Sequence, residues 1–228
     1  MAKSSIHFRK VSAFSFKHNE TSRPAYAIFD PDENEINRSA KAAKQMWDRL
    51  YDRAIEKLTA EGVKRKPEKK NTLHEAVINL ENWHTLDDIE ALSQEIEAEL
   101  GITALQISVH RDEGHINEET GDVKMNYHAH VTYFTLDQET GRQNWRQAKV
   151  KPKLSEIQDL VADRLGMERG KSSTRRHIES GKYREMMQGY DKLKSIAYQL
   201  AEENEILKEQ IKSKEDEEDR VLRGQKTP

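Results

Sequence analysis

A seam of regularly spaced residues near the end of the chain constrains the fold more than any other feature of the sequence. Its nine positions are spaced alternately three and four residues apart, which is the heptad spacing of a coiled-coil helix. Leucine occupies three successive d positions, and a lone asparagine at an a position favours a parallel pair of helices. We therefore predict a dimerisation helix over residues 183–212, with packing on its own domain as the alternative. The seam consists of Tyr183, Met186, Tyr190, Leu193, Ala197, Leu200, Asn204, Leu207 and Ile211.

The seam ends in a highly charged segment. After Ile211 the seam positions are occupied by Lys214 and Glu218, and so polar a run has too little apolar surface to bury. We expect residues 213–228 to form a charged, flexible tail.

Residues 1–182 alternate between strand-like and helix-like segments. Helical spacing of apolar residues follows the capping residues Ser39 and Thr85 and recurs over residues 154–165. A turn near Gly121 joins the last two predicted strands into a long antiparallel hairpin. This pattern predicts an α+β domain over residues 1–182, with helices flanking an antiparallel sheet. Strands are predicted at residues 5–16, 74–80, 102–110 and 126–136, and the segment 25–37 is predicted to hold a short strand that closes in an Asp-Pro turn.

The net charge of −3 conceals blocks of opposite sign. Residues 1–73 carry 16 basic and 10 acidic side chains, a balance of +6, whereas residues 74–140 carry 2 and 15, a balance of −13. Residues 141–200 return to +7, and residues 201–228 carry −3. The two basic blocks are compatible with a nucleic-acid partner, which the total charge alone would argue against.

The chain has no cysteine, so histidine and carboxylate side chains would have to hold any metal ion. Its longest apolar run, residues 25–29, is far shorter than the ~20 residues that a transmembrane helix needs. The first part of the chain also lacks the apolar core of a signal peptide. We expect a cytoplasmic protein without a membrane segment.

Histidines mark the candidate site. His128 and His130 lie two residues apart in a predicted strand, so both imidazoles project from one face. His110 ends the preceding strand, where the hairpin would bring it beside them. Three imidazoles that leave coordination positions open are typical of a catalytic metal site.

Two neighbouring features bear on this site. Asp112 or Glu113 would accept a hydrogen bond from the second ring nitrogen of a ligand and so fix its tautomer. His115 is a competing third ligand, ranked below His110 because it lies further along the arm of the hairpin.

Three blocks of the sequence carry a family resemblance. FSFKHNE at 14–20, VHRDE with HAH within 109–130, and MERGKSSTRRHIESGKYREM at 167–186 occur in that order. Together they resemble the relaxase domain of plasmid mobilisation proteins of the MobV (Mob/Pre) type, which are HUH endonucleases. The resemblance spans nearly all of residues 1–186.

The resemblance implies a metal-dependent enzyme of a plasmid-bearing or mobile-element-bearing bacterium. Such an enzyme nicks one strand of its origin of transfer, stays attached to the 5′ phosphate, and starts conjugative transfer of single-stranded DNA. The implied nucleophile is His18, the acidic partner is Glu113, and the metal ligands are His110, His128 and His130. The implied ion is Mn²⁺ or Mg²⁺, although three imidazoles also accept Zn²⁺ or Co²⁺. The implied partners are single-stranded or hairpin origin DNA and the conjugation machinery.

Basic side chains in two of these blocks are candidates for contacts with the DNA backbone, which supply affinity and register more than sequence choice. Trp145 would either stack on an unpaired base or pack within the domain. The candidate DNA-binding residues are Lys17, Arg23, Arg169, Lys171, Arg175, Arg176 and His177.

The sequence departs from the family pattern in two places and leaves alternatives open. Residues 114–127 are inserted between the DE pair and the HxH pair, and Thr21 stands where the family usually has arginine. Tyr26 is an alternative nucleophile, and a tyrosine linkage would indicate a rolling-circle replication initiator instead. A protein of another class, a non-catalytic coiled-coil DNA-binding protein with a structural or regulatory metal, would carry similar features.

Overall fold

The computed structural model describes residues 3–21, 27–117, 120–145, 150–170 and 180–224, and the structural statements below concern these residues. The chain divides into two units. The first comprises residues 1–116 with 122–172, and the second comprises residues 117–121 with 173–228.

An antiparallel sheet of five strands forms the centre of the first unit. The order across the sheet is β2-β4-β8-β5-β3, so β8 and its neighbours β4 and β5 lie in the middle. The pairing of β5 with β8 is the long antiparallel hairpin that the sequence predicts. The strands are β2 (Ile6–Lys10), β4 (Leu73–Asn79), β8 (His128–Phe134), β5 (Thr103–His110) and β3 (Glu35–Ile36).

Two further strand pairs form separate two-stranded sheets. β1 (Lys3–Ser4) pairs in parallel with β9 (Glu168–Arg169). The arm of the hairpin contains β6 (Gly114–Ile116) and β7 (Val123–Met125), which pair antiparallel. The inserted residues 114–127 therefore form, in their described part, a two-stranded arm.

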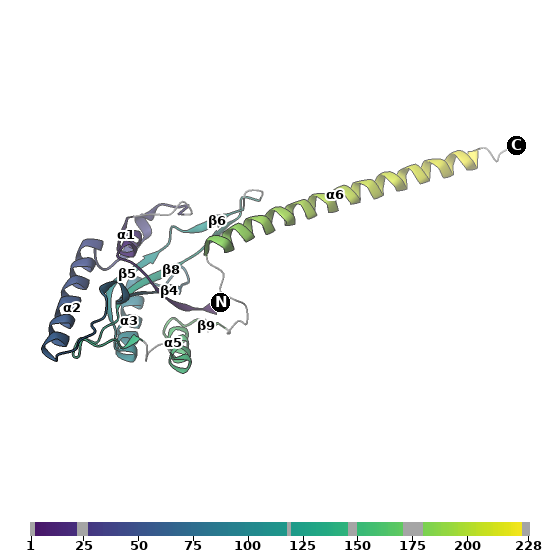
Figure 1. Ribbon diagram of the computed structural model, residues 1–228. Coiled ribbons are helices and arrows are strands. Elements are labelled where there is room, and N and C mark those ends of the chain that lie inside the picture. The colour runs from purple at the N-terminus through teal and green to yellow at the C-terminus, as the bar shows by residue number, and fades with distance from the viewer. Residues whose placement is uncertain (1–2, 22–26, 118–119, 146–149, 171–179, 225–228) are drawn as a thin grey trace. The chain divides into compact units, whose positions relative to one another are not determined.

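Helices cover both faces of the sheet (Figure 1). On one face, α1 (Phe14–Glu20) and α2 (Ala40–Ala60) bury Phe16 and Trp47 against Phe134. On the other, α3 (Leu86–Leu100) and α5 (Lys151–Arg164) pack on a larger apolar cluster. That cluster contains Ala76, Ile78, Ile89, Leu92, Ile96, Ile107, Val109, Ala129, Val131, Ile157 and Val161.

Local sequence explains the ends of the longer helices. Ser39 accepts a hydrogen bond from the Ala42 amide at the start of α2. Thr85 and Asp88 form a reciprocal capping box at the start of α3. Gly101 ends α3 in the left-handed conformation at φ 62°, which glycine adopts without steric cost. Two short 3-10 turns, Pro31–Glu33 and Lys69–Asn71, complete the elements of this unit.

Two predicted strands are corrected by the structure. The strand predicted over residues 5–16 ends at Lys10, and residues 14–20 are helical. In the segment 25–37, predicted to hold a short strand that closes in an Asp-Pro turn, Ala27 makes an isolated bridge to Glu113, and among the described residues Glu35–Ile36 forms the ladder, after the turn. In the first segment, Val11, Ala13 and Phe16 pack in the apolar cluster beneath α1 and α2 instead of continuing the strand.

The second unit is dominated by α6 (Ser180–Gly224). The helix begins before residue 183 and continues well beyond residue 212, so residues 213–224, predicted as a flexible tail, are helical. The described apolar side chains of the seam are exposed, for example Leu193 at 68% and Leu207 at 54%. No described helix is long and apolar enough to cross a membrane.

Candidate metal and catalytic site

Three histidines meet at one end of the sheet because two neighbouring strands carry them in register. His110, the last residue of β5, lies directly opposite His128, the first residue of β8. His130 follows two residues later and projects from the same face. The centroids of the three rings lie 4.8 to 5.1 Å apart, and all three side chains are buried. The hairpin thus brings the three predicted ligands together.

The tautomers of the β8 histidines suit a metal ion. Nδ1 of His128 lies 2.8 Å from the carbonyl oxygen of Asn126, and Nδ1 of His130 lies 3.2 Å from Oε2 of Glu75. The carbonyl acceptor favours a proton on Nδ1 of His128, and the negative charge of the nearby Glu75 carboxylate favours a proton on Nδ1 of His130, which leaves a lone pair on each Nε2. The two Nε2 atoms lie only 3.1 Å apart. Two lone pairs that face each other in this way fit a shared cation, so the donor set is compatible with a divalent metal ion.

Burial keeps these ligands in the form that binds metal. Burial, with a further contribution from the charge of His130, lowers the pKa of His128 to about 3. Burial also lowers the pKa of His130. Neutral imidazole is the metal-binding form, so little proton competition remains at neutral pH.

Glu113 lies beside two of the predicted ligands. Its Oε1 is 3.4 Å from Nδ1 of His110, and its Oε2 is 3.7 Å from Nε2 of His128. Donor atoms of His110, Glu113 and His128 all lie within 4.8 Å of one another. The carboxylate is therefore placed either to orient His110 or to join the metal donors directly.

His115 lies away from this cluster. It is exposed on β6 and pairs with Lys124 of β7. Among the described residues, neither of the two groups with metal-donor spacing contains it. Its rank below His110 agrees with this placement.

His18 lies on α1, next to the three histidines. Its ring centroid is 5.5 Å from that of His130 and 5.8 Å from that of His110. The side chain is half-buried, whereas the three predicted ligands are buried. His18, His110 and His130 form the second group whose donor atoms lie within 4.8 Å of one another. The alternative nucleophile Tyr26 lies outside the described residues.

Buried polar contacts, which the sequence did not predict, hold α1 on the sheet. Nε2 of Gln106 donates to the carbonyl oxygens of Phe16 (3.3 Å) and Arg38 (3.0 Å). Oε1 of Gln106 accepts from Nδ2 of Asn19 at 3.2 Å. Oγ of Ser108 donates to the Asn19 carbonyl at 2.9 Å. Phe16 and Asn19 flank the nucleophile candidate in α1, so these bonds fix its position beside the histidine cluster.

Sequence reasoning also missed Glu75 and Arg9. Glu75, fully buried in the middle of β4, accepts two hydrogen bonds from Arg9, the residue opposite it in β2. Burial opposes its ionisation, but His130 and Arg9 outweigh that effect and lower the pKa of Glu75 to about 2. The available signal was the carboxylate of Glu75 within the predicted strand HEAVINL, directly before its apolar residues Ala76 to Ile78. Its partner depends on the pairing of β2 with β4, which local sequence does not reveal.

The predicted DNA-binding residues are placed only in part. Lys17 is exposed in the last turn of α1. Arg169 forms an ion pair with Asp159 and donates to Oγ of Ser155 at 2.8 Å, so its positive charge is paired within the domain. The remaining candidates lie outside the described residues: Arg23, Lys171, Arg175, Arg176 and His177.

Trp145 packs inside the domain. It is buried, and its ring centroid lies 5.2 Å from that of Phe8 and 4.6 Å from that of His74. The packing alternative for this residue is therefore correct, and base stacking is not available to it.

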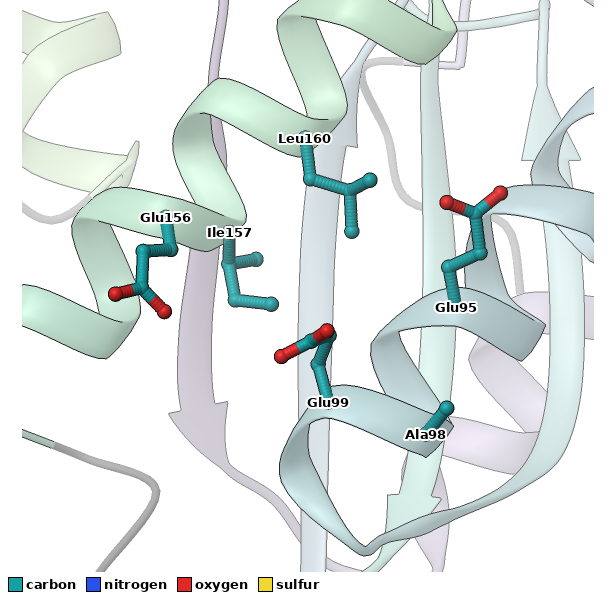
Figure 2. A pocket seen from close by; sticks show the side chains of 6 residues that line it. All are labelled: Glu95, Ala98, Glu99, Glu156, Ile157 and Leu160. Carbon is teal, nitrogen blue, oxygen red and sulfur yellow. The ribbon is translucent and has the colours of Figure 1, made fainter.

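A pocket between α3 and α5 lies on the face of the sheet opposite to the histidines (Figure 2). Arg164 pairs with Glu95 at 2.7 Å. Lys153 pairs with both Glu99 and Glu156. These ion pairs join the two helices and balance the acidic lining, which indicates a structural role. The lining residues are Glu95, Ala98, Glu99, Glu156, Ile157 and Leu160.

Comparison with known proteins supports the fold. No model of a known protein family matches the chain. No curated protein matches it either. Among solved structures, the MobM relaxase domain (MOBV; Mob_Pre) bound to 26-nucleotide pMV158 oriT DNA matches with a TM-score of 0.53 and 19% sequence identity. The match covers 80% of this chain and 99% of that one. The α+β fold that the sequence resemblance implied is therefore confirmed.

Proposed function

We propose that this chain, which has the relaxase fold, is a MobV-type plasmid mobilisation relaxase. It nicks one strand of an origin of transfer by transesterification, keeps the 5′ phosphate on His18, and so starts conjugative transfer of single-stranded DNA. One observation carries the proposal: a half-buried histidine on the covering helix lies beside a buried cluster of three histidines, with ring centroids 5.5 and 5.8 Å away from two of them. The reaction belongs to the bacterial cytoplasm, where the plasmid DNA lies.

His110, His128 and His130 would hold the divalent ion, Mn²⁺ or Mg²⁺ from the resemblance, with Zn²⁺ or Co²⁺ also compatible with three imidazoles. When bound, such an ion offsets negative charge on the non-bridging oxygens of the scissile phosphate. Glu75 and Asn126 orient two of the ligands through their Nδ1 atoms.

The chain's own residues supply the nucleophile and its placement. A neutral imidazole nitrogen of His18 forms a bond to phosphorus while the bond from phosphorus to the 3′ oxygen breaks. The proton lost from the phosphorylated imidazole balances the one that the departing 3′ oxygen takes up. The resulting phosphoramidate can be reversed by attack of a 3′ hydroxyl, which suits strand transfer followed by religation. Gln106 and Ser108 hold α1 so that the ring stays over the histidine cluster.

A covalent-adduct assay tests this proposal. The protein is incubated with Mn²⁺ and single-stranded oligonucleotides that tile the DNA upstream of its own gene. We expect a protein–DNA adduct that survives denaturing electrophoresis, disappears in His18→Ala, and persists in the matched variant His115→Ala. An adduct at full yield in His18→Ala would refute the role of His18.

Two further outcomes would favour other functions. Mass spectrometry that maps the adduct to Tyr26 would indicate a rolling-circle replication initiator. Binding of duplex DNA without cleavage, with or without metal, would indicate a non-catalytic DNA-binding protein.

We also propose that α6 forms a homodimer through residues 183–212. The support is the exposure of apolar side chains at the seam positions of a regular helix, together with Asn204 at an a position. Glu203 and Lys208 occupy g and e positions, where a parallel pair brings opposite charges together.

A further inference from the structure

The edge strand β2 exposes basic side chains on the face of the sheet that holds the metal site. Arg9 lies opposite Glu75, and His7 lies opposite Val77. Val77 in turn lies opposite His130 in β8. Directly opposite residues of antiparallel strands project from the same face, so Arg9 and His7 share the face of the candidate ligands. Two strand spacings place His7 about 10 Å from His130.

Among the described residues, the side chains on this part of the face are exposed, whereas those of the histidine cluster are buried. His7 is exposed, and the side chain of Arg9 is 47% exposed. The helices α1 and α2 contact β5, and α1 also contacts β8. Both strands are separated from β2 by β4. An extended strand of nucleic acid could therefore lie along β2 and reach the metal site across β4.

Arg9 is held in a fixed orientation. Its Nε and Nη2 atoms donate to the same carboxylate oxygen of Glu75, at 2.8 and 2.5 Å. Glu75 is fully buried and lies beside His130, so the anchor of the guanidinium belongs to the metal site itself. A guanidinium has five N–H donors, and these two bonds use two of them. The remaining fork is preorganised for a phosphate group.

We infer that Arg9, assisted by His7, is a phosphate-binding residue that guides the single DNA strand along β2 into the metal site. The inference rests on the proposed relaxase function and adds a contact on β2 that neither the basic block at 167–186 nor Lys17 supplies. The occupant is the backbone of single-stranded DNA because Arg9 carries a fixed positive charge, its anchor Glu75 lies beside His130 of the reactive site, and both Arg9 and His7 lie along one extended strand.

The chain offers a matched control in the next residue. Lys10 carries the same charge but lies opposite His74, on the other face of the sheet, where its Nζ donates to Asn71. Arg9→Gln and Lys10→Gln therefore remove the same charge from opposite faces of one strand.

The test measures fluorescence anisotropy of a labelled, mixed-sequence single-stranded 20-mer in EDTA at 50 to 200 mM salt. Each phosphate contact contributes about 0.7 to the slope of log affinity against log salt for single strands. We expect Arg9→Gln to weaken binding several-fold and to reduce the slope by roughly this amount, and Lys10→Gln to leave the slope unchanged. Arg9→Lys should restore most of the slope, because it keeps the charge while losing the fork geometry.

A gain of charge avoids any dependence on the Glu75 anchor. His7→Lys adds a cation to the proposed row, and Ala91→Lys adds one to exposed α3 on the opposite face. We expect His7→Lys to bind the 20-mer more tightly and with a steeper salt slope than Ala91→Lys. Equal slopes in these two variants, or an Arg9→Gln slope equal to that of the wild type, would overturn the inference. Failure of the wild type to bind the 20-mer would instead count against the relaxase function.

Discussion

Glu75 shows how a single buried charge organises the candidate metal site. It accepts two hydrogen bonds from Arg9 and lies beside Nδ1 of His130. Loss of a partner behind a metal-ligating histidine typically costs 10- to 100-fold in metal affinity. We expect Glu75→Gln to weaken Mn²⁺ binding by about that factor, measured by isothermal titration calorimetry. Glu56→Gln, an exposed change of the same kind on α2, serves as the control, and equal affinities in both variants would contradict the role of Glu75.

The buried imidazole of His128 should make the metal-free protein sensitive to acid. Burial holds its pKa at about 3 in the folded state, against an ordinary value of 6.5. Between these values the unfolded chain binds a proton that the folded chain does not, so the free energy of unfolding falls as the pH drops below 6.5 and continues to fall toward pH 3. The loss from this group is on the order of 2 kcal/mol at pH 5.

Urea unfolding in EDTA between pH 7 and pH 5 measures this loss. We expect the His128→Gln variant to have a flatter profile than the wild type, and His115→Gln, a change at an exposed histidine, to keep the wild-type profile. A His128→Gln profile as steep as that of the wild type would show that other groups cause the acid sensitivity.

Among single residues, the sequence predicts those contacts that follow from spacing within one strand or one hairpin. His128 and His130 share a face because a strand has a period of two, and His110 joins them because the hairpin is antiparallel. Glu75 and Arg9 were not predicted because they meet through the pairing of β2 with β4, whose residues are about 66 positions apart. A pairing between distant strands depends on the whole sheet, whereas a hairpin depends on neighbouring sequence.

Among the elements, α1 shows most clearly how tertiary contacts override local pattern. The segment FSFKHNE was predicted partly as strand, since aromatic residues alternate with polar ones. The helix has seven residues, and Ala13 at its N-cap makes no side-chain hydrogen bond. So short a helix is unstable alone. It forms because Phe16 is buried against Trp47 and because Gln106 binds its backbone. By contrast, α2 and α3 were predicted well because their caps are local.

Gln106 should therefore control the order of α1. Its loss leaves buried partners unsatisfied, at about 1–3 kcal/mol for each. We expect Gln106→Ala to increase hydrogen exchange in residues 14–20 and to lower the yield of the His18 adduct, with binding of single-stranded DNA retained. Gln158→Ala is the matched control, since Gln158 bonds the backbone of Ile6 from the opposite face. If hydrogen exchange in residues 14–20 were unchanged in Gln106→Ala, Gln106 would not control the order of α1.

On the scale of the whole molecule, the two units differ in how much of their structure the sequence predicts. The first unit was predicted as an α+β domain because strands and helices alternate, and the structure confirms this class. In the second unit, the heptad predicts a helix that ends at residue 212, where charged side chains begin to occupy the seam positions. The helix continues to Gly224 since a solvated helix tolerates charge on every face, while a coiled-coil seam does not.

The dimer proposed for α6 can be tested on the seam itself. Leu193 and Leu200 occupy d positions and are 68% and 52% exposed, so a second copy would bury them. We expect the Leu193→Glu/Leu200→Glu double variant to be monomeric at tens of micromolar by sedimentation equilibrium, because burial of paired carboxylates in the seam is strongly unfavourable. Ile206→Glu adds a charge at a c position, which lies off the seam although the side chain is 50% exposed, and should remain dimeric. A wild-type monomer at that concentration, or loss of the dimer in Ile206→Glu as well, would argue against a parallel pair through residues 183–212.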